Sequence, residues 1–223
     1  MLITNPDSMW GTVYDDTNKL ALQLKIGDCL SFGSFIPNET YQAPSIRVPM
    51  LWHVIDKKNN RLKLLSYFFF EHMGYWPMDN SKTGAWEATE IRDLLNDQWF
   101  HDCFTDSERN AILTTDVKTR TGDSSFVVTR DKLYVPALED IENIPEHLKI
   151  GRGLTVENTG KDTFAVNLMY CFYWLRDPGD YEDENLVVQG YADKKIVLDS
   201  LEHDADEVGV RAVMWVDAEK IDK

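Results

Sequence analysis

TGAWEATEIRDLLNDQWFHDCF, residues Thr83 to Phe104, is the stretch that decides the fold of this chain. On a helical wheel turning about 100° per residue, Ile91, Leu95 and Trp99 share one side and Asp93 lies opposite. A helix with one apolar side is expected to lie on a core. We therefore predict one main amphipathic helix at about residues 83–104.

Most of the remaining chain has the pattern of strands. Apolar residues alternate with polar ones at 20–26, which predicts a half-buried strand. Two apolar runs, 46–56 and 61–70, flank the polar residues 57–60, and this arrangement predicts a β-hairpin with a four-residue connection. Residues 1–19 are poor in apolar side chains, and we interpret them as an irregular lead-in.

After the main helix, Thr105 and Glu108 have the spacing of a capping box, which predicts a short second helix at about 106–113. The polar stretch 116–125 is interpreted as rich in turns, and Gly151–Gly153 as a turn that lacks the spacing of a phosphate-binding loop. Further strands are expected at 31–36, 126–128, 164–176, 186–191, 195–198 and 208–216, and a break within 164–176 is left open.

Charge excludes two classes of partner. The chain has 23 basic and 38 acidic residues among its 223, for a formal net charge of −15. A nucleic acid or an anionic membrane would be repelled over most of such a surface. No apolar run reaches the length of about 20 residues that a membrane-spanning helix needs. The first residues lack the pattern of a signal peptide, so we expect a soluble, cytoplasmic protein.

The sequence offers no motif for a cofactor or a metal. Cys29, Cys103 and Cys171 are widely spaced and are expected to be buried free thiols. The acidic stretches 180–185 and 202–207 could supply oxygen ligands to calcium, but they lack the spacing of a calcium loop and are expected to be solvated. We therefore expect no cofactor, no metal site and no catalytic residue.

Several motifs, taken in order, resemble a bacterial family of domains of unknown function. Its central motif is a Trp-Glu-x-Ser/Thr-x-x-Arg-x-x-Leu-Asn helix, followed by Trp-Leu-Arg-Ser-Pro and Gly-Val-Arg-Pro-Ala. Asp177 stands where the family has Ser, and Ala212 stands where it has Pro. The matching residues here are Trp86, Glu87, Thr89, Arg92, Leu95 and Asn96, then Trp174–Pro178, then Gly209–Val213.

The order of these motifs is also similar to the C-type-lectin-like fold that formylglycine-generating-type domains share. The resemblance implies an α+β fold of mainly antiparallel sheets with one main helix, a short second helix and long loops. It implies a single lectin-like domain over residues 20–223, in which the first and last strands pair.

The family motifs contain three arginines, Arg92, Arg176 and Arg211. One hypothesis is that they converge, with Trp174 and Asn96, on an anionic ligand, because guanidinium groups bind carboxylate and phosphate in a bidentate manner. The hypothesis that we favour is structural: a half-buried Arg pairs with a nearby carboxylate such as Glu87. In this interpretation the border residues Trp86, Glu87, Arg92 and Asn96 form a polar latch that ties the helix to strands and loops.

From fold analogy we expect a non-catalytic domain that recognises a protein or a glycan through loops between residues 116 and 207. Two alternatives stay open: a structural component of a bacterial or phage assembly, and an enzyme whose site is built from the same loops.

Overall fold

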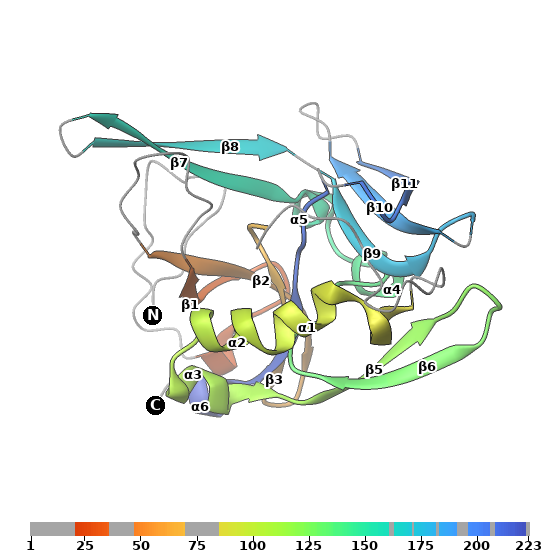
Figure 1. Cartoon of the computed structure of the whole chain (residues 1–223). Coiled ribbons are helices and arrows are strands. Elements are labelled where there is room, and N and C mark those ends of the chain that lie inside the picture. The colour runs from red at the N-terminus through yellow and green to blue at the C-terminus, as the bar shows by residue number, and fades with distance from the viewer. Residues whose placement is uncertain are drawn as a thin grey trace.

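A computed structural model describes residues 21–35, 47–69, 85–160, 163–170, 172–181, 183–190, 196–205 and 208–221 (Figure 1). The chain folds as α+β, with mostly antiparallel sheets, short helices and long loops, as predicted. The expected lead-in at 1–19 lies outside the described residues. Within the described part of the chain, no helix is long and apolar enough to cross a membrane.

Five strands of the described residues form the main sheet, in the order β1-β2-β3-β12-β4, and every neighbouring pair is antiparallel. The expected pairing of the first strand with the last is wrong, because the last strand lies between β3 and β4. The members are β1 (Cys29–Phe35), β2 (Val48–Lys58), β3 (Arg61–Ser66), β4 (Ile112–Leu113) and β12 (Val213–Asp217).

The predicted hairpin is confirmed as β2 and β3, but its connection is the two residues Asn59 and Asn60 rather than four. Asn59 has a φ of 56°, a conformation that Asn tolerates better than most residues. The strand predicted at 20–26 is wrong. The structure has the short 3-10 helix η2 (Ala21–Gln23) there, and burial of Ala21 and Leu24 follows a spacing of three.

The main helix is shorter than predicted and is broken. Residues 83 and 84 lie outside the described residues; the rest forms η3 (Trp86–Ala88), α1 (Glu90–Asn96) and α2 (Gln98–Cys103), which run end to end in Figure 1. The backbone of Thr89 is extended, and the Thr89 side chain accepts a hydrogen bond from the N–H of Arg92 at the start of α1. The backbone of Asp97 leaves helical geometry, with φ −114° and ψ −83°. The wheel pattern continues across both breaks, which explains why it predicted one helix.

The second helix is confirmed as α3 (Asp106–Ala111), with the predicted capping box between Thr105 and Glu108. It ends two residues earlier than predicted, because residues 112 and 113 leave it to join β12 as strand β4. The other short helices are α4 (Leu138–Ile141), α5 (Glu146–Lys149) and α6 (Ala218–Ile221).

Outside the main sheet, the described strands form one three-stranded sheet, β11-β10-β9, and two hairpins. The polar stretch 116–125 is strand over its first five residues and turn over 121–125, so the prediction of turns holds for its second half only. The apolar stretch 164–176 is divided between two strands that belong to different sheets. Residue 152 begins a strand, and not a turn. The members are β5 (Thr115–Arg120), β6 (Phe126–Asp131), β7 (Arg152–Gly160), β8 (Thr163–Tyr170), β9 (Tyr173–Pro178), β10 (Glu184–Gly190) and β11 (Ile196–Glu202).

The core lies between the main sheet and the α1–α2 segment. Ile91 and Leu95 of α1 are fully buried, and the ring of Phe104 lies 6.2 Å from that of Trp52 and 5.6 Å from that of Phe32. Aromatic residues thus build much of the core on this face.

The thiols follow the prediction where they are described. Cys29 and Cys103 are buried, and burial raises the pKa of Cys103 to about 12, so that it stays protonated. Cys171 lies outside the described residues. No group of three or more His, Cys, Asp or Glu among the described residues is placed to hold a metal ion.

Candidate functional site

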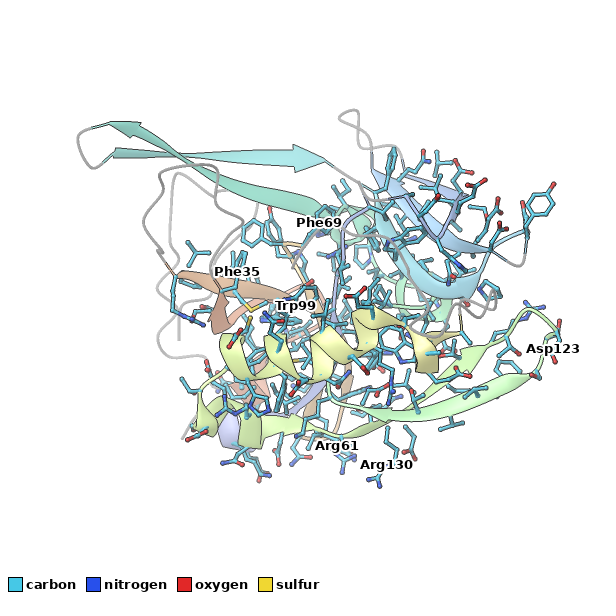
Figure 2. The ribbon with its side chains drawn as sticks, in the orientation of Figure 1. Phe35, Arg61, Phe69, Trp99, Asp123 and Arg130 are labelled. Carbon is cyan, nitrogen blue, oxygen red and sulfur yellow. The ribbon has the colours of Figure 1, made fainter. Side chains whose placement is uncertain are left out.

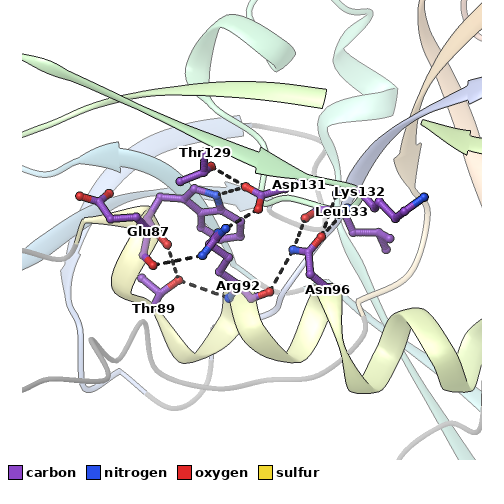
Figure 3. Close-up of polar contacts among 9 residues, drawn as sticks. Glu87, Thr89, Arg92, Asn96, Thr129, Asp131, Lys132 and Leu133 are labelled. Atoms are coloured by element: carbon purple, nitrogen blue, oxygen red, sulfur yellow. Dashed lines mark hydrogen bonds and ion pairs between the residues drawn. The ribbon is translucent and has the colours of Figure 1, made fainter. Parts of the chain in front are cut away.

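Asp131, at the end of β6, is the centre of the contacts that hold α1 in place (Figure 3). Its side chain is buried and accepts three hydrogen bonds: from Trp86 Nε1 at 2.8 Å, from Thr129 Oγ1 at 2.5 Å and from Arg92 Nε at 2.9 Å. A buried carboxylate is stable only when it is paired and hydrogen-bonded in this way. The helix is therefore tied to the β5–β6 hairpin through one carboxylate.

Asn96 makes the second set of contacts between α1 and the chain after β6. Its Nδ2 donates to the carbonyl of Leu133 at 2.8 Å, and its Oδ1 accepts from the N–H groups of Lys132 at 2.8 Å and Leu133 at 3.2 Å. These backbone groups belong to an irregular segment and have no strand partner to bond. We call Trp86, Arg92, Asn96 and Asp131 the α1 latch.

Glu87 has a different place from the one expected. Arg92 Nη1 bonds to the backbone carbonyl of Glu87 at 3.3 Å, and the carboxylate partner of Arg92 is Asp131. The pairing of Arg92 with the Glu87 side chain is thus a wrong expectation. The Glu87 atom Oε2 is buried without a hydrogen-bond partner among the described residues, at the edge of a cavity.

Arg176 is buried and pairs with Asp140 of α4. Its Nη1 lies 2.9 Å from Asp140 Oδ2 and 2.7 Å from the carbonyl oxygen of Val135. Lys63 of β3 forms a second ion pair with the same carboxylate. Burial opposes ionisation of Asp140, but the charges of Arg176 and Lys63 outweigh it and lower its pKa. These two ion pairs of Asp140 connect α4 to β9 and β3.

Arg211 is fully buried and satisfies backbone carbonyls. It donates to the backbone carbonyl oxygens of Ser66 at 2.8 Å, Leu148 at 3.1 Å and Lys149 at 3.2 Å. Its guanidinium carbon lies 4.9 Å from the ring centre of Tyr173. Trp174 is fully buried as well. The three motif arginines therefore lie in three separate environments. None of them lines the cavity of about 560 Å³ or the cavity of about 730 Å³ that are described below.

The two departures from the family pattern both have local partners. Asp177 Oδ2 accepts the N–H of Leu138, the first residue of α4, at 2.6 Å. The N–H of Ala212 donates to Ser66 Oγ at 3.0 Å, a bond that a proline at this position could not make.

Loops between residues 116 and 207 enclose one side of a cavity of about 560 Å³, which we call the loop cavity. Its walls are the tip of the β5–β6 hairpin at 121–125, residues 178–181 and 184 between β9 and β10, and Glu87 with Ala85. Figure 2 shows Asp123 at the hairpin tip, far from the α1–α2 segment. Among the described residues, four carboxylates line the cavity, those of Glu87, Asp123, Asp180 and Glu184, and no basic side chain does.

Hydrogen bonds hold both walls of the loop cavity. Asp123 accepts from Thr121 Oγ1 at 2.5 Å and from the backbone N–H of Ser125 at 3.0 Å, and bonds from the Thr121 and Ser125 hydroxyls lower its pKa to about 2. In the other wall, Ser200 Oγ donates to Glu184 Oε2 at 2.8 Å and accepts the N–H of Asp180 at 3.0 Å.

An exposed aromatic ring stands at the rim of this cavity. Tyr181 is 71% exposed, the most exposed of the large apolar or aromatic side chains in the described part of the chain. A carboxylate-lined cavity with such a ring can accept hydrogen bonds from, and attract, a ligand that presents N–H or O–H groups or positive charge.

Sequence analysis did not identify the residues of this cavity individually. It placed recognition on loops in this part of the chain, but it interpreted the 180–185 stretch as a solvated charge cluster and the hairpin as a turn-rich stretch. The available signal was the alternation of Val117 and Thr119, which are buried, with Asp116, Lys118 and Arg120, which are exposed.

Comparison with known proteins identifies one family. The family model described as "Domain of unknown function (DUF6273)" matches residues 59–218. No match was found among curated proteins or among solved structures.

Proposed function

The chain belongs to this family of unknown function, and from that premise we propose that it is a binding domain whose ligand is recognised at the loop cavity. The ligand that the lining favours is a basic segment of a protein, rich in Lys or Arg. The observation that carries the proposal is the set of four carboxylates around one cavity, which no basic side chain opposes in the described part of the chain.

Electrostatics supports this choice of ligand. A cleft lined by one sign of charge focuses its field and raises the local concentration of oppositely charged groups. The net charge of −15 attracts the same partners from a distance. The exposed ring of Tyr181 offers a cation–π surface to an arriving Lys or Arg.

A glycan is the second candidate, and a specific observation favours it. Carboxylates and hydroxyls beside an exposed aromatic ring can accept and donate hydrogen bonds to sugar hydroxyls while the ring packs against the sugar face. Thr121, Ser125 and Tyr181 lie on the loop cavity together with its carboxylates.

The test maps binding on the full chain by NMR. The probes are a hexalysine peptide, the same peptide with every side chain acetylated, and a neutral gluco-oligosaccharide. We expect saturable shifts in amide signals of 121–125 and 179–184 with hexalysine, and none with the acetylated peptide. Saturable shifts there with the oligosaccharide alone would assign the glycan instead.

Two variants locate the site. Replacing Asp180 by Asn together with Tyr181 by Ala is expected to remove these shifts. The matched control is Asp93→Asn, which removes an exposed carboxylate of α1 that does not line the loop cavity. Hexalysine shifts that spread evenly over the acidic surface, or that survive the double substitution, would contradict binding at the loop cavity.

A further inference from the structure

A second cavity, of about 730 Å³, lies at the other end of the β5–β6 hairpin. It opens where the base of this hairpin meets the β2–β3 connection, the edge strand β4 and its neighbour β12. Lys58, Arg61, Arg130, Asp116 and Trp215 line it, with Asn and Thr side chains between them, and we call it the basic cavity.

Strand register brings these side chains together. Lys58 and Arg61 are partners across the tight β2–β3 connection, and Trp215 lies between Lys63 of β3 and Leu113 of β4. Arg130 is paired with Asp116 in the β5–β6 hairpin. Because side chains at alternate positions share one face of a sheet, these residues point out of the molecule on the same side. Figure 2 shows Arg61 and Arg130 next to each other at this edge.

The charge of the basic cavity is opposite in sign to the net charge of the molecule. Its lining has three cations, Lys58, Arg61 and Arg130, against one carboxylate, Asp116, which leaves an excess of two positive charges on a chain of net charge −15. Such a local reversal concentrates anions at one place on a surface that repels them elsewhere.

These cations are weakly engaged within the protein. Arg61 has no ion pair or side-chain hydrogen bond to any described residue. Arg130 Nε lies 3.6 Å from Asp116 Oδ1, and the two side chains are 78% and 76% exposed. Lys58 Nζ lies 3.4 Å from Asp56 Oδ2, and this pair is also at the surface. Exposed pairs of this kind contribute little to stability, so a ligand can compete for the guanidinium groups.

We propose that the basic cavity binds a small-molecule oxyanion, a phosphate or a polycarboxylate, through the guanidinium groups of Arg61 and Arg130. Guanidinium forks match both oxyanions in a bidentate geometry. The Trp215 ring forms the wall of the site and is held by the ammonium groups of Lys58 and Lys63, at 5.3 and 5.9 Å from its centre. The cavity volume lies within the range of small-molecule sites.

The experiment is calorimetric titration of the full chain with pyrophosphate and with citrate, at an ionic strength held constant with sodium chloride. We expect saturable binding at one site by at least one of the two, and the stronger of them identifies the oxyanion. Arg61→Gln and Arg130→Gln are each expected to weaken binding about tenfold. Asp116→Asn removes the carboxylate that competes for Arg130, and is expected to tighten binding two- to threefold.

Arg120→Gln is the matched control, because Arg120 is an exposed arginine of the same hairpin that does not line the basic cavity. Arg120→Gln is expected to change the dissociation constant of the oxyanion by less than twofold. Equal weakening by Arg120→Gln and Arg130→Gln would overturn the proposal, since the anion would then bind along the hairpin face. No binding of either probe, weaker binding by Asp116→Asn, or tighter binding of a short single-stranded oligonucleotide than of pyrophosphate would also overturn it. Thermal melting of each variant verifies that these surface substitutions leave the fold intact.

Discussion

Asp131 depends on partners that come from a different part of the chain, and Arg92 is the partner that can be removed most cleanly. Arg92→Ala leaves the buried carboxylate without its charged donor, while Trp86 and Thr129 still bond to it. Breaking a buried pair costs about 3–5 kcal/mol. Since the Arg92 side chain is 25% exposed, we expect a smaller loss, about 2 kcal/mol, or roughly 4–8 °C in melting temperature.

Thermal melting followed by circular dichroism measures this loss. Arg120→Ala is the control, because Arg120 is exposed and donates to Ser124 Oγ at 3.1 Å at the hairpin tip; its effect should stay within about 0.5 kcal/mol. A melting curve of Arg92→Ala that coincides with the wild-type curve would contradict the structural role of the α1 latch.

Gly179 supports a second prediction at the scale of one residue. A Cβ at this position would lie 2.6 Å from Glu184 Cβ and against Ser200 Oγ, so Gly179→Ala must displace the wall of the loop cavity. Overpacking of this kind costs about 1–3 kcal/mol. Gly122, in the opposite wall, has open space around its Cβ position, and Gly122→Ala should change the free energy of unfolding by less than about 0.5 kcal/mol. Urea unfolding compares the two; equal effects would show that the close approach at Gly179 relaxes without cost.

Residue-level sequence reasoning selected Trp86, Arg92 and Asn96 as border residues of a helix, but it could not find Asp131. The carboxylate lies 39 residues after Arg92. Local periodicity indicates which side of a helix is buried, whereas the partner of a half-buried polar group is decided by strand pairing far along the chain.

At the scale of elements, the prediction of long, regular segments was correct in type and wrong in boundary. The β2–β3 hairpin and α3 were found because apolar runs and a capping box are local signals. The break at Asp97 was missed, because α1 and α2 both stay apolar on their buried side. The break is decided by how α1 and α2 are each buried against different neighbours, and the sequence pattern does not contain this information.

The ion pairs that join α4 to β9 and β3 give stability a dependence on pH. The pKa of Asp140 in the folded state lies below its ordinary value of 3.8. A carboxyl group with a lowered folded pKa contributes stability that is present above its unfolded pKa and is lost as pH falls through the folded pKa. We therefore expect the free energy of unfolding to fall below about pH 4, partly through this group.

Asp140→Asn tests the assignment. At pH 7 it leaves Arg176 buried without its carboxylate, at a cost of about 3 kcal/mol. Below pH 4 the difference between wild type and variant should shrink, because the Asp140 carboxyl of the unfolded wild-type chain then takes up a proton and the stability gained from its ionised form declines. Glu139→Gln is the control, since Glu139 is largely exposed and lies 3.6 Å from Arg176. Urea unfolding at pH 7 and pH 3 measures both; a difference that does not change with pH would exclude Asp140 as the titrating group.

At the scale of the whole molecule, the β5–β6 hairpin connects the features described above. Its tip forms a wall of the loop cavity, its base lines the basic cavity, and Asp131 at the end of β6 is bonded to α1. Six residues in each strand separate tip and base by about 20 Å. An acidic and a basic cavity thus lie on one element whose position the α1 latch determines.

The net charge of −15 leads to the last prediction, which concerns the entire surface. Repulsion among excess carboxylates destabilises the compact state, and salt screens it, with a Debye length that falls from about 30 Å at 0.01 M to about 8 Å at 0.15 M. We expect the melting temperature at pH 7 to rise by about 2–4 °C over this range of sodium chloride, which corresponds to about 1 kcal/mol.

Two comparisons separate surface repulsion from specific pairs. Arg92→Ala should show the same rise from its lower starting point, because the half-buried pair with Asp131 is screened less than surface charges. Near the isoelectric point of about 4.7 the rise should disappear, since the net charge is then close to zero. A melting temperature that falls with salt at pH 7 would show instead that surface ion pairs outweigh the repulsion, and that the excess of carboxylates is compensated across the folded surface.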